Sequence, residues 1–461
     1  MLQRREQTQD WISQPVYRVV PLSDELQRIK ELFPDEAVME AVRPFYSNDA
    51  GRPSEDPVLL TKTLFLSFFS DVVGDANTLE TLRNRLNWRQ FCELRLDEPL
   101  FHRTTLVKFR RTVGLTVIET LFRTLLTDLV PQGLGDFRHR VFDGPPVKAR
   151  AALTPDRDEV YTETLAAIAV KLQQYHAQQI ALDPELNTTP VELTKTEYAV
   201  ENAGVDARWA QELKPGGDRR SAGDPEARFQ RGKHGTRSEL GDEMFFSTDS
   251  AQLFIEDVLV SADASQGQTL FTETLTQSEP GHQWSVDAEF RTGEILHAAE
   301  EARVTLNTPV QKGPAQGNQF PKTEFVYHED TDTYTCPAQQ TLAHCGTSEK
   351  TGERRYRADR GVCDAGPYRE DCTTSKTGRT VTRNRFEAEW SRQREHARTP
   401  GAVMGKVLRG IVAEGKCAEA VRHGLKIMRY VGRSMAVLQS PLVAYILNLK
   451  RLLRVEAQAT S

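Results

Sequence analysis

The first quarter of the chain has apolar positions at helical spacing, bounded by residues that cap or end helices. In the segment SEDPVLLTKTLFLSFFSDVVG, Asp56 has the place of an N-cap, Pro57 that of the first helical residue, and Gly74 that of a stop. The next segment, NTLETLRNRLNWRQFCEL, repeats leucines at helical spacing, at Leu79, Leu82 and Leu86. The pattern predicts that residues 22–114 are mainly helical.

The last of these segments, TTLVKFRRTVG, is basic and is predicted to start on a threonine cap and end at Gly114. Lys108, Arg110 and Arg111 lie in its body. Short helices joined by tight turns, with the last one basic, suit a helix-turn-helix-like contact with DNA. A plain helical bundle explains the same pattern, so the residues alone leave both interpretations open.

Near residue 140 the pattern changes to short apolar runs suited to strands. RVFDG is predicted to be a strand, followed by a polar helical stretch and a loop rich in glycine and charge at 214–242. Residues 243–311 then predict the order strand, strand, helix, strand, helix, strand, which builds a mixed α/β sheet. Residues 323–385 contain a hairpin pattern and four cysteines, and residues 386–455 return to helix.

Charge is distributed unevenly along the 461 residues. The whole chain has a net charge of -6, which excludes a uniformly basic nucleic-acid binder. Residues 391–454, however, contain 13 Lys or Arg against 3 Glu, a local net charge of +10. Such a segment suits a polyanion such as DNA, although a solvated helix face would have a similar composition.

The start of the chain has no apolar signal segment, and its most apolar stretch is too short for a membrane span. Six cysteines in a long chain without an export signal favour a reducing compartment. We therefore expect a cytoplasmic protein, associated with the nucleoid if it binds DNA, and no membrane partner.

Three acidic residues recur at places suited to a shared site. Asp143 closes the first predicted strand, Asp287 lies in the strand segment WSVDAEF, and Glu414 lies on a helix of the basic segment. Each also has an ordinary explanation, because Asp-Gly is a common turn, Asp287 could cap a turn, and most glutamates are solvated. If they converge, hard carboxylate oxygens of this kind could hold two divalent metal ions for phosphodiester chemistry.

With these motifs in order, the chain resembles bacterial insertion-sequence transposases of the DDE type, which combine a helical N-terminal domain with an RNase H-like catalytic domain. The segments that carry the resemblance are GRPSEDPVLLTKTLFLSFF, NTLETLRNRLNWRQFCEL, TTLVKFRR, VFDGPPVKARAA, DPEARF, SVDAEF, IVAEGKCAEAVRHGLKIMRYVGR and NLKRL. Each segment is weakly specific, but their order along nearly the whole chain is specific.

The sequence departs from the family pattern at several positions. Pro145 stands where the family usually has Thr, and Phe290 where it usually has Tyr. Val421, beside Arg422, stands where a lysine is usual, and Phe101-His102 replaces a Pro-Asp pair. These departures leave open that this copy is decayed but keeps the fold.

The resemblance implies a transposase that binds terminal inverted repeats and catalyses metal-dependent DNA cleavage and strand transfer. It implies that Asp143, Asp287 and Glu414 are the catalytic residues and hold two Mg²⁺ or Mn²⁺ ions. The implied DNA-binding residues are Lys108, Arg110, Arg111, Lys148, Arg422, Lys426 and Arg433. The implied partner is double-stranded DNA, as inverted repeats and as target, with a homodimer or higher oligomer assembled on it. The alternative is a catalytically inactive relative that acts only as a DNA-binding repressor.

We accordingly expect an α/β protein with an RNase H-like mixed sheet, divided into four parts. Residues 1–130 form the helical DNA-binding domain, and residues 131–322 the first part of the catalytic domain, with a helical insertion at about 155–240. Residues 323–385 form a cysteine-containing insertion, and residues 386–461 the C-terminal helical part of the catalytic domain.

Four cysteines in the 323–385 segment raise the question of a structural zinc ion. Eight, 17 and 8 residues separate Cys336, Cys345, Cys363 and Cys372, whereas structural zinc sites favour pairs two to four residues apart. Gly366 stands where the family has a further cysteine. A zinc site is therefore the less favoured alternative to reduced, non-liganding thiols, and Cys92 and Cys417 are expected to be packing residues.

Overall fold

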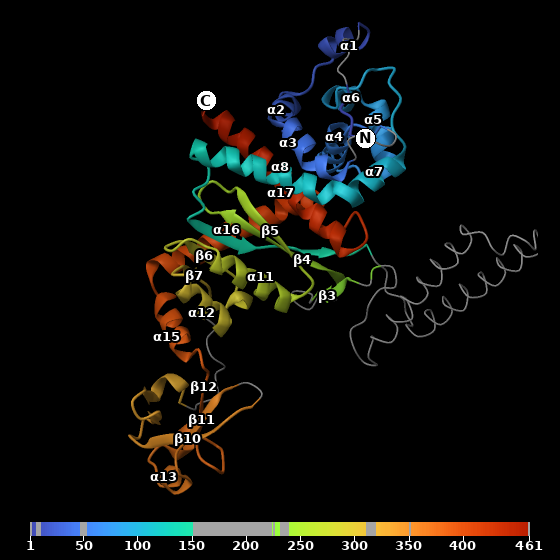
Figure 1. The fold of residues 1–461 in the computed structure, drawn as a ribbon. Coiled ribbons are helices and arrows are strands. Elements are labelled where there is room, and N and C mark those ends of the chain that lie inside the picture. The colour runs from blue at the N-terminus through green and yellow to red at the C-terminus, as the bar shows by residue number, and fades with distance from the viewer. Residues whose placement is uncertain are drawn as a thin grey trace, which may run out of the picture.

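A computed structural model describes residues 2–5, 11–46, 53–150, 224, 226–230, 239–309, 320–349 and 352–459 (Figure 1). Most of the helical insertion predicted at about 155–240 and most of the loop at 214–242 lie outside these residues, and residues 228–230, which are described, form a strand.

The N-terminal region is helical, as predicted. Its α-helices are α1 (Ser13–Val19), α2 (Asp24–Leu32), α3 (Asp35–Val42), α4 (Pro57–Phe69), α5 (Asp75–Asn84), α6 (Leu86–Phe91), α7 (Arg103–Phe109) and α8 (Leu115–Leu129). Short turns of other helix types are η1 (Arg43–Phe45), η2 (Arg110–Gly114) and η3 (Val130–Gln132). The predicted start of α4 is confirmed, because the Asp56 side chain accepts a hydrogen bond from the Val58 amide and Pro57 is the first helical residue.

Three predicted boundaries in this region are wrong. Helix α4 ends at Phe69, and Gly74 instead precedes α5 with a φ of 94°. The predicted helix from residue 77 divides into α5 and α6, and the N-cap of α7 is His102 rather than a threonine.

Gly114 does not end a helix, since the chain continues through η2 into α8. A Cβ atom at Gly114 would lie 2.7 Å from the Leu438 side chain. Close packing against a distant helix therefore explains this glycine.

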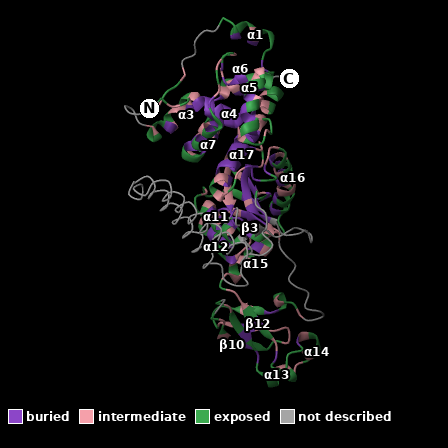
Figure 2. Cartoon of the chain, turned by 90° about the vertical axis from the view of Figure 1, so that its right-hand side faces the viewer, coloured by how far each residue is buried: buried purple, intermediate pink, exposed green. Residues whose placement is uncertain are grey.

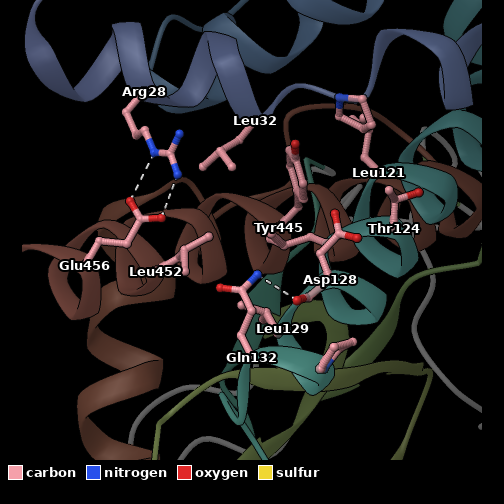
Figure 3. A pocket seen from close by; sticks show the side chains of 13 residues that line it. Arg28, Leu32, Leu121, Thr124, Asp128, Leu129, Gln132, Tyr445, Leu452 and Glu456 are labelled. Atoms are coloured by element: carbon pink, nitrogen blue, oxygen red, sulfur yellow. Dashed lines mark hydrogen bonds and ion pairs between the residues drawn. The ribbon is translucent and has the colours of Figure 1, made fainter. Parts of the chain in front are cut away.

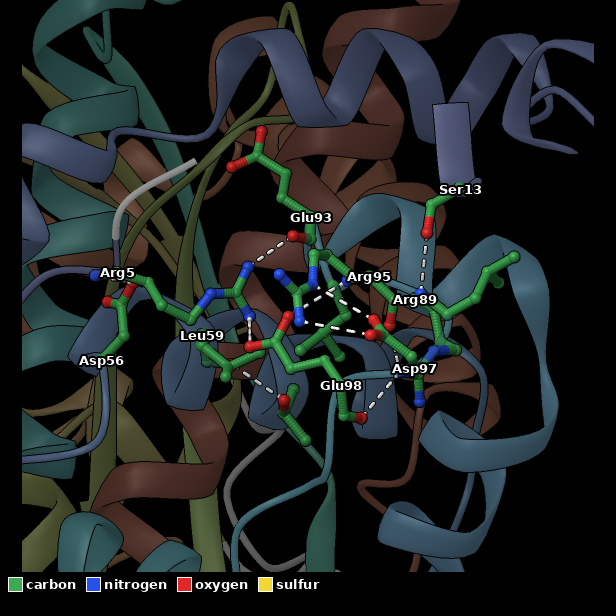
Figure 4. Close-up of polar contacts among 12 residues, drawn as sticks. Arg5, Ser13, Asp56, Leu59, Arg89, Glu93, Arg95, Asp97 and Glu98 are labelled. Atoms are coloured by element: carbon green, nitrogen blue, oxygen red, sulfur yellow. Dashed lines mark hydrogen bonds and ion pairs between the residues drawn. The ribbon is translucent and has the colours of Figure 1, made fainter. Parts of the chain in front are cut away.

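Two arginines, one buried and one half-buried, secure the loop that follows α6 (Figure 4). Arg89, which is 4% exposed, donates to the backbone carbonyls of Arg95 and Glu98. Arg5 donates to the Glu93 carbonyl and pairs with the Glu98 carboxylate at 3.0 Å. The extended N-terminal residues and this loop thus become part of the helical region.

A mixed sheet with helices on both faces follows, and we call it the main sheet. Its strands are β1 (His139–Asp143), β2 (Pro146–Lys148), β3 (Arg228–Gln230), β4 (Glu239–Asp249), β5 (Ile255–Ser261), β6 (Gln283–Val286) and β7 (Thr305–Asn307). The order β2-β4-β1-β6-β7 is antiparallel from β4 to β1 and parallel from β1 through β6 to β7, while β3 and β5 also pair with β4. The mixed sheet predicted from the strand and helix order is therefore confirmed.

Alternating side chains of the main sheet enter two different cores. Phe142, Phe245 and Trp284 pack beneath α11 (Ala264–Thr276) and α12 (Gly293–Glu301). On the other face, Val141 packs against α16 (Pro400–Arg422), and Met244 joins the core that contains α17 (Arg433–Ala459). Two short helices, η6 (Ala288–Phe290) and α15 (Glu387–His396), complete this region.

Helix α17 connects the main sheet with the N-terminal helices (Figures 1 and 2). Its residues Leu442 and Tyr445 are buried in the same core as α4 and α8. Arg429, just before it, donates to the Ser67 carbonyl at 2.9 Å and pairs with Asp71 at 2.7 Å. The end of the chain is therefore packed into the region formed by its beginning.

Between β7 and α15, the chain forms a second sheet, which we call the small sheet. Its strands are β8 (Val326–His328), β9 (Thr333–Thr335), β10 (Thr341–Thr347), β11 (Arg354–Arg357) and β12 (Thr380–Arg383), paired antiparallel in the order β12-β11-β10-β9-β8. The short helices η7 (Lys322–Glu324), α13 (Arg360–Asp364) and α14 (Arg369–Cys372) accompany them. The predicted hairpin is thus confirmed as β8 and β9.

Candidate functional site

Asp143 lies at the end of β1 in a tightly packed turn. Its Oδ1 atom accepts a hydrogen bond from the Gly144 amide at 2.8 Å. A Cβ atom at Gly144 would lie only 1.5 Å from the Met244 carbonyl oxygen of β4. Glycine is therefore needed at position 144 because β1 and β4 approach closely there, and the hydrogen bond from its amide holds the Asp143 carboxylate at the strand end.

Asp287 follows β6 directly and lies beside Asp143. Strands β1 and β6 are parallel, with Phe142 paired to Val286, so the next residue on each strand is one of the two aspartates. The Asp287 Oδ1 atom accepts a hydrogen bond from the Ala288 amide at 2.8 Å. The structure thus brings these two predicted site residues to the same edge of the main sheet.

A guanidinium group joins the two carboxylates. Arg409 Nη1 lies 2.7 Å from Asp143 Oδ2, and Arg409 Nη2 lies 3.8 Å from Asp287 Oδ1. The side chains of Asp143 and Arg409 are 20% and 23% exposed, while that of Asp287 is 43% exposed, so the group opens to solvent on the Asp287 side. The Arg409 guanidinium therefore lies within ion-pair distance of both carboxylates.

Sequence reasoning missed Arg409. The signal was present in the periodicity of α16, whose buried residues include Gly405, Val412 and Lys416. Arg409 falls on the same face at helical spacing, four residues after Gly405. A basic residue on the sheet-facing side of a helix needs a carboxylate partner, and this could have pointed to the aspartates.

Glu414 does not join the aspartates in this arrangement. Helix α16 packs against β1, β6 and β7, but the Glu414 side chain is exposed and makes no hydrogen bond or ion pair within the described chain. Glu414 comes five positions after Arg409, which places the two side chains about 140° apart around the helix axis. When Arg409 faces the sheet, Glu414 therefore points away from it.

Two aspartates and a cation form an arrangement that fits a divalent metal ion. Carboxylate oxygens are the ligands that Mg²⁺ and Mn²⁺ prefer, and the Arg409 guanidinium is a stand-in cation between them. Within the described residues, no group of three or more His, Cys, Asp or Glu could hold a metal ion. Asp143 and Asp287 therefore lack a third described ligand, although their oxygens are of the kind that a divalent ion binds.

The predicted DNA-binding residues differ in their surroundings. Lys108, Arg111, Lys148, Arg422 and Lys426 are exposed.

Arg110, in contrast, is 6% exposed and makes two hydrogen bonds to Asp75, at 2.8 and 3.1 Å. Its guanidinium also lies 3.8 Å from the centre of the Tyr430 ring. Because these contacts hold Arg110 in the interior, its predicted role in binding DNA is replaced by a structural one.

Arg433 is half-buried and is tied to the DPEARF segment. Its Nε lies 3.1 Å from Asp242 Oδ1, and its backbone amide donates to Glu226 at 2.7 Å. Asp224 accepts a hydrogen bond from the neighbouring Gly432 amide at 3.2 Å. Burial raises the pKa of Asp242, and the positive charge of Arg433 opposes this shift. The segment therefore fixes the start of α17, and the charge of Arg433 is largely compensated.

The cysteines are free thiols in packed or exposed positions. Cys336, Cys363 and Cys372 pack against the core of the small sheet, and Cys345 is exposed. Burial raises the pKa of the Cys372 thiol, and it raises that of Cys92 to about 12. These thiols are therefore protonated at neutral pH, and Cys92 serves as a packing residue, as expected.

A separate pocket lies between α2, α8 and α17 (Figure 3). The bidentate pair of Arg28 and Glu456 lies at one side of it, with Arg28 Nη2 2.8 Å from Glu456 Oε1. Tyr445 and Asp128 also line it, and burial raises the pKa of Tyr445. None of the predicted site residues contributes to this pocket.

Family comparisons agree with the arrangement of helical region and sheet. A model described as a transposase domain (DUF772) matches residues 14–112, and a model described as a transposase DDE domain matches residues 335–453. The chain is thus a transposase with an N-terminal DUF772 domain and a C-terminal DDE domain, the latter from a family of polynucleotidyl transferases.

The second matched range includes Arg409 and Glu414, whereas Asp143 and Asp287 lie outside both ranges. A search of curated proteins found no match, and neither did a search of solved structures. None of the described helices is long and apolar enough to cross a membrane.

Proposed function

We propose that this transposase binds the inverted repeats of a mobile DNA element and cleaves and joins DNA strands in an RNase H-like domain. The observation that carries the proposal is the pairing of Asp143 and Asp287 at the ends of neighbouring parallel strands, with one cation between them. The order and direction of the strands in the main sheet support the RNase H-like assignment. In this proposal the chain divides into residues 1–130, 131–322, 323–385 and 386–461.

In this mechanism, Asp143 and Asp287 would hold a divalent metal ion. Once bound, the metal would supply an activated water and stabilise the leaving oxygen of the phosphodiester. The chain itself orients the carboxylates, since the Gly144 and Ala288 amides each donate to one of them. If a metal ion displaced Arg409 from these carboxylates, its guanidinium would be available to pair with a phosphate oxygen of DNA.

For Glu414 to act as the third catalytic residue, either α16 would have to change its orientation, or the Glu414 side chain would have to reach around the helix. Transposases act on DNA, and we propose that this change takes place when an oligomer of the chain binds duplex DNA. The proposed assembly is a homodimer or higher oligomer on the element ends, with two Mg²⁺ or Mn²⁺ ions per active site. It would act in the cytoplasm, on nucleoid DNA.

Recognition of the element ends is assigned to the N-terminal helices. Lys108 on α7 and Arg111 on η2 are exposed, and together they offer two cationic contacts to the phosphate backbone. The exposed Lys148, Arg422 and Lys426 add charge near the main sheet. Arg110 is left out of this set because it pairs with Asp75.

A specific observation also favours the second candidate, an inactive relative that represses transposition by occupying inverted repeats. Glu414 is exposed without a partner in the described chain, and the Arg409 guanidinium pairs with Asp143 where a metal ion would have to bind. Pro145 replaces the usual Thr beside Asp143. A chain locked in this state would bind DNA without cutting it.

The two candidates differ in one assay. The purified chain is incubated with a labelled duplex that carries the element's own ends, in Mg²⁺ and in Ca²⁺. A transposase nicks the strand at the element boundary in Mg²⁺, whereas a repressor binds the same duplex in both ions and leaves it intact. Failure to prefer the element ends over competitor DNA would contradict both.

A further inference from the structure

The small sheet has two faces with different chemistry. Tyr334, Leu342, Tyr356 and Val381 point to one side, where they form a buried core. Tyr334 and Tyr356 pack edge to face with ring centres 5.1 Å apart, which makes this inner face rigid.

Strand alternation and register place a second set of residues together on the opposite side, which we call the outer face. Register partners share a face of a sheet, and the pairs Ala343–Arg357, Arg357–Thr380 and Arg355–Thr382 join three strands in this way. The outer face consists of Val326, His328, Thr333, Thr335, Thr341, Ala343, Arg355, Arg357, Thr380 and Thr382. Each of them is exposed or half-buried, so no described element covers the face.

The composition of the outer face is that of a surface for a polyanion. Five of its residues are threonines, two are arginines, and none is Asp or Glu. Threonine hydroxyls and arginine guanidinium groups are typical donors to phosphate oxygens of the DNA backbone. The only aliphatic side chains are Val326 and Ala343, so the face lacks the aromatic or large apolar centre of a protein-binding surface.

Arg355 and Arg357 differ from the other arginines around them. Within the described chain, neither makes an ion pair or a side-chain hydrogen bond, and both are exposed. Arg354, on the same strand but facing the other way, pairs with Asp332, and Arg369 pairs with Asp364 at 3.0 Å. The positive charge of the outer face is therefore uncompensated.

From this charge complementarity, we propose that the outer face of the small sheet binds the phosphate backbone of duplex DNA. This inference rests on the proposed function. The small sheet lies at the end of the molecule away from the N-terminal helices, so it would contact DNA at a place separate from Lys108 and Arg111 (Figures 1 and 2). The contact would be independent of base sequence, because it uses phosphates alone.

The test measures how DNA affinity depends on salt. Full-length wild-type chain, the double variant Arg355→Ala/Arg357→Ala and the control Lys376→Ala are titrated against a labelled duplex without element ends. Lys376 is an exposed cation of the same unit that lies outside the outer face. Loss of two phosphate contacts should lower the slope of log K against log salt by about 1.8 and weaken binding at 0.1 M salt roughly tenfold to sixtyfold. The control should keep the wild-type slope.

A charge-preserving variant, Arg355→Lys/Arg357→Lys, should retain most of the slope, which separates loss of charge from loss of fold. Equal slopes for the wild type and the double alanine variant would overturn the inference while leaving the proposed function in place. An equal loss in Lys376→Ala would overturn it too, because general charge rather than this face would then explain binding. If the double alanine variant changed only self-association, the outer face would be an interface between copies. If the wild type bound no DNA at all, the proposed function would fail as well.

Discussion

Replacing Arg409 with Gln should tighten the binding of Mn²⁺ to the DNA-free protein. Arg409 contributes the cation that pairs with Asp143 and Asp287, and a metal ion held by the same two carboxylates has to compete with it. The substitution removes the competing charge but keeps a polar, shorter side chain. The direction is informative, because most substitutions at an active site weaken the binding of its metal.

The magnitude follows from the exposure and distances of the group. The contact with Asp143 is short and less than a quarter exposed, so it resembles a hydrogen bond to a charged group, which contributes about 1.5–3 kcal/mol. The contact with Asp287 is longer and more exposed, and such pairs contribute about 0–1 kcal/mol. Loss of the first contact alone changes an affinity by roughly tenfold or more.

The assay is a titration of apo protein with Mn²⁺, in which free Mn²⁺ is measured by its paramagnetic resonance signal. The control Lys406→Gln removes a charge from an exposed position on the same helix and should leave the affinity unchanged. Asp143→Asn should abolish the tight site in both backgrounds. Unchanged or weaker Mn²⁺ binding by Arg409→Gln would refute the reasoning, since the guanidinium would then not occupy the metal position.

Three further predictions concern stability and DNA binding. Gly144→Ala should prevent correct folding of the main sheet, because its Cβ would overlap the Met244 carbonyl, and the variant should aggregate on expression. The control Gly410→Ala lies on α16 with open space around it. It should be neutral in urea unfolding or stabilise the protein by up to about 1 kcal/mol. Arg110→Ala should destabilise by about 2 kcal/mol, because it removes two hydrogen bonds between a buried guanidinium and the half-buried Asp75 carboxylate. Lys108→Ala should keep its stability and lower the salt slope of DNA binding by about 1. Burial lowers the pKa of His423 from 6.5 to about 4, so the unfolded chain takes up a proton that the folded chain does not, and stability should fall as pH drops through this window. Urea unfolding at pH 7 to 4.5 should show a shallower fall for His423→Gln, and an equal fall would contradict the assignment.

Local signals in the sequence were sufficient for most elements of the main sheet. Helix α12 begins after a typical capping residue, Thr292, whose hydroxyl accepts a hydrogen bond from the Ile295 amide. The strand ends that carry Asp143 and Asp287 were also recognisable from the apolar runs before them. In each case the residues that form the element are close together in the sequence, so the element can be predicted from a short stretch of it.

Long-range packing explains what could not be predicted. Gly114 reads as a helix stop, but its small size is needed against Leu438, which lies more than three hundred residues away in the chain. Arg110 reads as a DNA contact, but Asp75 and Tyr430 hold it inside the protein. The rotation of α16, which brings Arg409 rather than Glu414 to the aspartates, depends on contacts with three strands. None of these partners is visible in a local window of sequence.

The measurement that tests the central claim most directly compares Asp287→Asn with the wild type on a labelled element end. The variant keeps the side-chain shape but removes one of the two carboxylates that would hold the metal, while Asp371→Asn, an exposed aspartate of α14, is the matched control. We predict that Asp287→Asn binds the end in Ca²⁺ as well as the wild type does, and that its cleavage in Mg²⁺ is slower by roughly three decades, about 4 kcal/mol in barrier. Asp371→Asn should cleave at the wild-type rate. Cleavage by Asp287→Asn within about tenfold of an active wild type, about 1.4 kcal/mol, would contradict the account, because Asp287 would then not be part of the catalytic site.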